Sequence, residues 1–164
     1  MKNIKLIWAF VLLIITAIGC NNDDSDRRGS VLLSFTYSGC KNVAESQVVR
    51  GSDVENIMGT ETFQYEGIGN DNLLISHVNA LYGCDAELSA TAIIENRNII
   101  IKEENAVTHS LVNCVCPFDL TMVIGSLSPG KYTIKVYRED DELYSSFIID
   151  YTPDVKGEQR VQSL

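Results

Sequence analysis

The sequence lacks the motifs that mark the common enzyme classes. It has no G-x-S-x-G nucleophile elbow, no H-E-x-x-H zinc motif and no glycine-rich phosphate-binding loop, and no nucleophile stands in a recognisable arrangement with a base. Its acidic groups, Glu103-Glu104, Asp119 and Glu139–Glu142, are more typical of solvated charges than of paired catalytic carboxylates. The sequence therefore predicts no catalytic residue, no cofactor and no enzymatic activity.

Positive charge is also scarce. The chain has 13 Lys and Arg against 22 Asp and Glu, a formal charge of −9. Residues 1–19 hold two of the lysines and no acid, so the charge becomes −11 without them. Nucleic acid and anionic lipid headgroups are poor partners for so acidic a surface. We expect no nucleic-acid binding.

The N-terminal apolar run is too short for a stable membrane-spanning helix. Leu6–Ile18 has 13 residues, fewer than the roughly 18 that a spanning helix needs. It follows Lys2 and Lys5 and ends at Gly19-Cys20, which is the layout of a secretory signal. Gly19-Cys20 also resembles the lipobox of bacterial lipoproteins, which implies cleavage before Cys20 and acylation of that residue. The alternative is an ordinary signal peptide followed by an unrelated cysteine.

A polar tether is expected at residues 20–30. Beyond Cys20 it has no apolar side chain to bury. Its aspartates at 23, 24 and 26 resemble the acidic export signal of Bacteroidota-type lipoproteins, although any solvated linker can be acidic. The prediction is a lipid-anchored protein of the outer membrane, on its periplasmic or cell-surface face.

The rest of the chain is predicted to be all-β. After residue 30 there is no long 3.6-residue apolar period, whereas strand-like segments recur with turn residues between them. The expected strands are Val31–Tyr37, Glu61–Glu66, Asn72–Val78, Ala86–Glu95, Ile99–Lys102, Phe118–Ile124, Tyr132–Val136 and Leu143–Tyr151. They favour one small two-sheet sandwich over residues 31–152, followed by a frayed tail at 153–164. Residues 41–60 are the least legible, and a helical turn is possible at Asp53–Met58.

Two resemblances bear on this domain. The run Leu127–Val136, with Pro129-Gly130 at its turn, looks like a hairpin of immunoglobulin-like and prealbumin-like sandwiches. The pattern H-x-N-x4-C at His77–Cys84, followed by I-x-E and by C-x-C-x-x-D at Cys114–Asp119, resembles an uncharacterised family of Bacteroidota-type lipoproteins. The first resemblance implies a fold and the second implies a location and a β architecture. Neither implies an activity.

With Cys20 lipidated, four cysteines remain and are candidates for disulfides. They are Cys40, Cys84, Cys114 and Cys116. An exported domain usually pairs its cysteines. Neighbours at i and i+2 on a strand do not face each other, so Cys40 and Cys84 are each expected to pair with one member of the C-x-C. Which one is left open.

The alternative is a metal or thiol-redox site. His77, Cys84, Cys114 and Cys116 offer soft ligands suited to zinc or copper(I). Against this, C-x-C lacks the two-residue spacer of zinc knuckles, and a lone histidine beside an apolar strand is more often a hydrogen-bonded structural residue. His109 lies in a polar stretch and is expected to face solvent.

The sequence therefore predicts a lipid-anchored, non-catalytic binding or assembly module. Its partners would be the membrane, through the N-terminal lipid, and a protein or glycan at the cell surface. Contacts would come from loops or from strand addition at a sheet edge. The alternatives are the cysteine-based metal or thiol-redox protein and a hydrolase on a sandwich scaffold.

Overall fold

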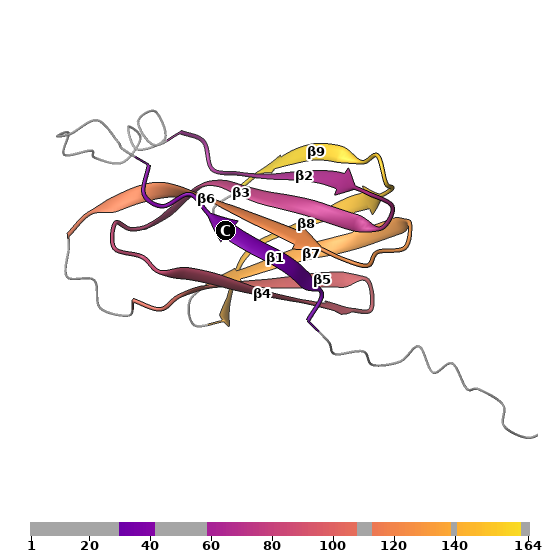
Figure 1. Ribbon diagram of the computed structural model, residues 1–164, viewed down its shortest axis with the longest axis horizontal. Helices are drawn as coiled ribbons and strands as arrows, with labels where there is room; N and C mark the ends of the chain where they lie inside the picture. Colours follow the sequence, from indigo (N-terminus) through magenta and orange to yellow (C-terminus); the bar gives the residue numbers. More distant parts are fainter. Residues whose placement is uncertain (1–29, 42–58, 108–112, 139–140, 162–164) are drawn as a thin grey trace, which may run out of the picture.

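The computed structural model describes residues 30–41, 59–107, 113–138 and 141–161. The regular structure in these ranges is nine β-strands (Figure 1). They are β1 (Leu32–Tyr37), β2 (Thr62–Ile68), β3 (Asn72–Gly83), β4 (Leu88–Glu95), β5 (Asn98–Asn105), β6 (Val115–Ile124), β7 (Gly130–Arg138), β8 (Glu142–Tyr151) and β9 (Lys156–Arg160). Within the same ranges, no helix has the length and hydropathy that would let it cross a bilayer.

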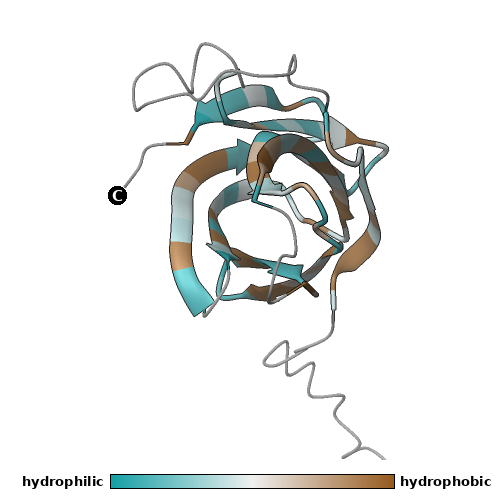
Figure 2. Cartoon of the chain, turned by 90° about the vertical axis from the view of Figure 1, so that its left-hand side faces the viewer, coloured by the Kyte–Doolittle hydropathy of each residue, from teal (hydrophilic) through white to brown (hydrophobic). Residues whose placement is uncertain are grey.

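The strands form two facing sheets, which confirms the expected all-β sandwich. One sheet has the order β1-β6-β3-β2-β9 and the other β4-β5-β7-β8. Figure 2 looks along the sandwich and shows the sheets curving around a common interior. All neighbouring pairs are antiparallel except β5 and β7, which are parallel. The backbone N–H of Val31 also donates to the carbonyl of Ala92 at 3.0 Å, which links the sheets beside β1.

Alternation of more buried and less buried residues describes most of the strands. The expected inward face of β4 is confirmed, because Leu88 and Ala92 are buried and Ala90 and Ile94 pack against the core. The turn between β4 and β5 is also a hairpin as expected. Asn96 and Arg97 have φ values of 47° and 63°, the left-handed conformation that two-residue hairpin turns require.

One expected hairpin is instead a crossover between sheets. Residues 125–129 connect β6 in one sheet to β7 in the other. The two edges of β6 are already occupied by β1 and β3, so β7 has no edge of that strand to pair with. Gly130 still has the positive φ, 130°, that its place in the turn predicts.

The interior consists of a larger and a smaller apolar cluster. The larger cluster draws on both sheets and contains Phe63, Leu73, Ile75, Ala92, Ile99, Ile101, Met122, Ile124, Leu127, Tyr132, Ile134, Val136, Phe147, Ile149 and Tyr151. The smaller contains Ala80, Tyr82, Ala86, Leu88, Cys116, Phe118 and Leu120. On β3, His77 is buried at the point where the inward face passes from Ile75 to Ala80. A polar residue therefore lies at the junction of the two clusters.

The expected frayed tail is wrong for residues 156–160, which form β9 and pair with β2. Tyr65 lies opposite Gly157, Lys156 forms an ion pair with Glu66 at 3.0 Å, and Val161 N donates to the carbonyl of Glu61. The segment is polar because β9 is an edge strand, held by backbone hydrogen bonds rather than by apolar burial. Residues 162–164, the tether and the proposed turn at Asp53–Met58 lie outside the described residues.

Substitution of Gly157 tests this correction. A Cβ at this position would overlap the hydroxyl and ring of Tyr65, so Gly157→Val should lower the free energy of unfolding by about 1–3 kcal/mol. The matched change Glu158→Val, at an exposed position of the same strand, should stay within about 0.5 kcal/mol. Urea denaturation measures both. If residues 156–160 were frayed, valine at 157 would be neutral or stabilising.

Candidate functional site

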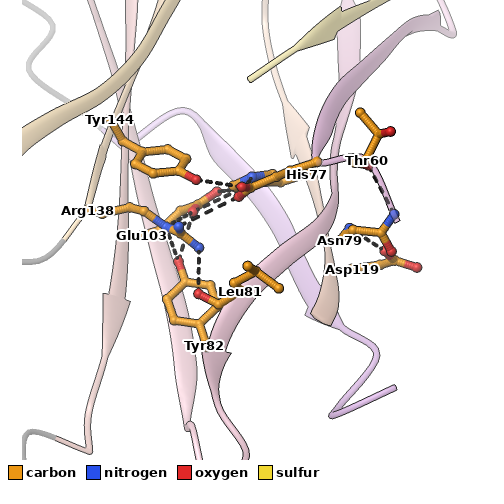
Figure 3. A network of polar contacts seen from close by, with 10 residues as sticks. Thr60, His77, Asn79, Leu81, Tyr82, Glu103, Asp119, Arg138 and Tyr144 are labelled. Carbon is orange, nitrogen blue, oxygen red and sulfur yellow. Dashed lines mark hydrogen bonds and ion pairs between the residues drawn. The ribbon is translucent and has the colours of Figure 1, made fainter. Parts of the chain in front are cut away.

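The most unusual group of side chains is a set of charges at the interior of the sandwich, of which His77 and Glu103 are buried and Glu61 and Arg138 are partly exposed. His77 and Glu103 are 0 % and 1 % exposed. The Nδ1 atom of His77 lies 2.9 and 3.1 Å from the two carboxylate oxygens of Glu103, and its Nε2 atom lies 2.8 Å from Glu61 Oε1. The imidazole stacks on Phe63, with ring centroids 4.0 Å apart. Figure 3 shows His77 and Glu103 at the centre of the network.

The two carboxylates require His77 to be an imidazolium, because a neutral imidazole donates only one hydrogen bond. Burial alone would lower the pKa of His77, but attraction to Glu103 and hydrogen bonds to Glu103 and Glu61 outweigh it and raise that pKa. Burial would likewise raise the pKa of each carboxylate, but contacts with His77 and attraction to Arg138 outweigh it and lower both. The contacts and the raised pKa both favour the charged form of His77.

Arg138 completes the network. Its guanidinium lies between two aromatic rings, 4.1 Å from the centroid of Tyr82 and 4.2 Å from that of Tyr144. Its Nε donates to Tyr82 Oη at 2.9 Å and lies 3.4 Å from Glu103 Oε2. Its Nη1 lies 3.7 Å from Glu61 Oε1. Two cations and two anions therefore balance inside the protein.

The tyrosine hydroxyls act as donors in this network. Tyr82 Oη donates to Glu103 at 2.9 Å, and Tyr144 Oη donates to Glu61 at 2.7 Å. Burial, followed by the charge of Glu103 for Tyr82 and by the hydrogen bond to Glu61 for Tyr144, raises the pKa of each hydroxyl. Both tyrosines therefore stay protonated at neutral pH.

The polar atoms of this network are occupied by contacts within the protein. Both ring nitrogens of His77 are engaged, so the imidazole has no lone pair with which to accept a proton from a substrate. Every buried side-chain nitrogen and oxygen in the described part of the chain has a hydrogen-bond partner. The interpretation of His77 as a hydrogen-bonded structural residue agrees with these contacts.

The four cysteines of the domain form two disulfides, Cys40–Cys116 and Cys84–Cys114. This confirms that Cys40 and Cys84 each pair with one member of the C-x-C, and it resolves the connectivity that the sequence left open. The bonds join residues 76 and 30 positions apart, and closing loops of this length is worth about 3–5 kcal/mol each in the chain-entropy model. They fasten the end of the sandwich next to the smaller core cluster.

The ligand set of the alternative metal site is not assembled in this form. Both ring nitrogens of His77 contact carboxylates, and all four sulfurs are in disulfides. The sulfur atoms that do gather are those of Cys40, Cys84 and Cys116, which lie within 4.8 Å of one another. Cys114 is outside that group.

Asn79 forms a bulge that carries β3 beyond its expected end at Val78. Its φ is 58° and the register with β6 shifts between His77 and Ala80, so Ala80 and Tyr82 still face inward. Asp119 holds the bulge in place. Its carboxylate accepts a hydrogen bond from the backbone N–H of Asn79 at 3.0 Å and forms an ion pair with Lys41. Asn79 Nδ2 donates to the Thr60 carbonyl at 3.1 Å (Figure 3).

The remaining acidic candidates that the structure describes are exposed or ion-paired. Glu104 is exposed, and Asp141 forms an ion pair with Lys102. Glu142 is exposed at the start of β8. Glu139, Asp140 and His109 lie outside the described residues, as does Cys20.

Each polar residue of the H-x-N, I-x-E and C-x-C-x-x-D pattern makes a defined internal contact. His77 binds Glu103, Asn79 binds Asp119, and the cysteines form disulfides. The sequence did not predict that Glu61, Arg138 and the two tyrosines join this network. Alternation along β5 could have indicated that Glu103 is buried, because Ile99, Ile101 and Glu103 share one face of that strand.

No family model, no curated protein and no solved structure matches this chain. An account of what it can do therefore rests on its own residues and their geometry.

The network makes stability depend on pH in both directions. The folded-state pKa of His77 is raised, so its contribution is complete below the usual value of 6.5 and is lost as pH rises through the folded pKa. The pKa values of Glu61 and Glu103 are lowered, so their contributions are complete above 4.5 and are lost as pH falls. Urea midpoints should therefore be highest between pH 4.5 and 6.5.

The control is the double variant His77→Gln/Glu103→Gln. It removes an anion and a cation together, so Glu61 and Arg138 remain balanced. The decline of the urea midpoint above pH 6.5 should shrink in this variant. An unchanged decline would mean that His77 is not its source.

Proposed function

We propose that this chain is a lipid-anchored lipoprotein of the cell envelope that acts as a non-catalytic binding or assembly module. The observation that carries the proposal is the pairing of the cysteines. The chain has five, and four of them form disulfides. Such bonds persist in oxidising compartments outside the cytosol. The remaining one, Cys20, follows the signal-like segment at the position where lipoproteins are acylated.

The internal contacts of the network support a non-catalytic role. His77 and Glu103 would be the strongest acid–base candidates by residue type, but their polar atoms contact one another and their internal partners. Asp119 is likewise paired with Lys41 and Asn79. These groups stabilise the sandwich and leave its surface to make contacts.

The strand register suggests which end of the domain meets a partner. Leu32, the first residue of β1, is level with Ile124 at the end of β6. Cys116 lies near the opposite end of β6, level with Tyr82. A lipid tether leading to β1 would therefore hold the disulfide-bearing end away from the membrane (Figure 1).

Two exposed apolar residues lie toward that distal end. Tyr37 at the end of β1 is 41 % exposed, and Val115 at the start of β6 is 52 % exposed. Of the two, Tyr37 is the stronger candidate anchor, because tyrosine is enriched among the residues that dominate binding at protein interfaces. The proposed location is the outer membrane, on its periplasmic or cell-surface face.

Acylation of Cys20 is the direct test of the anchor. Cells that express the full chain are fed an alkyne-tagged fatty acid and then fractionated, alongside cells that express Cys20→Ser. The wild-type chain should carry the label and sediment with membranes, because two or three acyl chains anchor stably. Cys20→Ser should carry no label and leave the membrane fraction. Cys40→Ser, which removes a domain cysteine instead, should keep the label. An unlabelled wild-type chain, or a Cys20→Ser chain that stays membrane-bound, would contradict the proposal.

A further inference from the structure

The two disulfides lie so close together that their sulfur atoms form one cluster. The Sγ atoms of Cys40, Cys84 and Cys116 are all within 4.8 Å of one another, although they belong to two different bonds. Cys114, the partner of Cys84, is not in the cluster. If Cys84 were released as a thiolate, it would stand beside both sulfurs of the other disulfide. This proximity is independent of the lipid anchor.

The four cysteines differ in how exposed they are to an external thiol. Cys114 and Cys40 are exposed, Cys84 is half-buried, and Cys116 is buried in the smaller core cluster. Each disulfide therefore joins an exposed cysteine to one that is less exposed. Attack on the sulfur of Cys114 would expel the sulfur of Cys84 into the cluster.

We infer that this pair of disulfides is a thiol–disulfide exchange site that accepts two electrons from a dithiol, either a small molecule or a protein. A thiolate of the dithiol attacks Cys114 Sγ, forms a mixed disulfide and expels Cys84 as a thiolate. The second thiolate of the dithiol attacks its own sulfur in the mixed disulfide and frees Cys114. The dithiol leaves as a disulfide, and its two protons remain with the two cysteines it has released.

The Cys84 thiolate then exchanges with the remaining disulfide, Cys40–Cys116. It attacks Cys116 Sγ and expels Cys40, or attacks Cys40 Sγ and expels Cys116; in either case one S–S bond breaks and one forms. The half-reduced protein keeps one cross-link, shared among three sulfurs. The distal end therefore stays fastened while it exchanges electrons with its partner.

Two variants that lack the same disulfide test whether a free thiol inside the cluster exchanges with the remaining disulfide. Both are made in the full chain with Cys20→Ser, so that only domain cysteines are scored. Cys114→Ser leaves Cys84 free inside the cluster, whereas Cys84→Ser leaves Cys114 free outside it. Each protein is held at mildly alkaline pH, quenched in acid, alkylated and mapped by peptide mass spectrometry.

In Cys114→Ser the alkyl label should be found on Cys84 and also on Cys40 or Cys116. In Cys84→Ser it should be confined to Cys114. Label confined to Cys84 in the first variant, or spread equally over the cysteines in both, would overturn the inference.

Partial reduction of the protein that retains all four domain cysteines covers the case in which a variant fails to fold. With limiting dithiothreitol, the species that retains one disulfide should contain Cys84–Cys116 or Cys40–Cys84. If that species contains only the two original pairings, the inference is wrong.

Discussion

The buried contact between His77 and Glu103 is the interaction on which the rest of the structure depends. It joins β3 of one sheet to β5 of the other, and Arg138 adds β7 to the same network. Breaking a buried ion pair by removing one partner typically costs about 3–5 kcal/mol, against a total stability of about 5–15 kcal/mol for a domain. Because the donors and acceptors must meet, the network also fixes how the two sheets are aligned.

Much of the fold follows from local sequence pattern. The features that the sequence did not predict depend on tertiary contacts. Alternation located eight of the strands and most of the core, since a half-buried strand needs a two-residue period. It could not locate β9, whose residues are polar and whose stability comes from pairing with β2. The expectation that Glu103 is a solvated charge is wrong, because its side chain is buried. Its contact with His77 crosses between sheets over 26 residues of chain, and no local pattern encodes that contact.

The disulfides were likewise predicted in part by local pattern and decided in part by tertiary structure. The geometry of C-x-C disfavoured a bond between Cys114 and Cys116, which left two favoured connectivities. The choice of Cys40–Cys116 and Cys84–Cys114 depends on where β1, β3 and β6 place their ends, which is a tertiary fact. The bonds and the Asn79 bulge lie at one end of the sandwich, whereas the chain enters β1 at the other.

The protonation state of His77 tests the central claim most directly. The chain has only two histidines, so His109→Gln leaves a single imidazole to observe. Long-range ¹H–¹⁵N NMR correlations distinguish an imidazolium, with both ring nitrogens protonated, from either neutral tautomer. The account predicts the imidazolium pattern for His77 at pH 7, because each of two carboxylates accepts a hydrogen bond from a protonated ring nitrogen. A single neutral tautomer at that pH would contradict it and would leave one carboxylate without its donor.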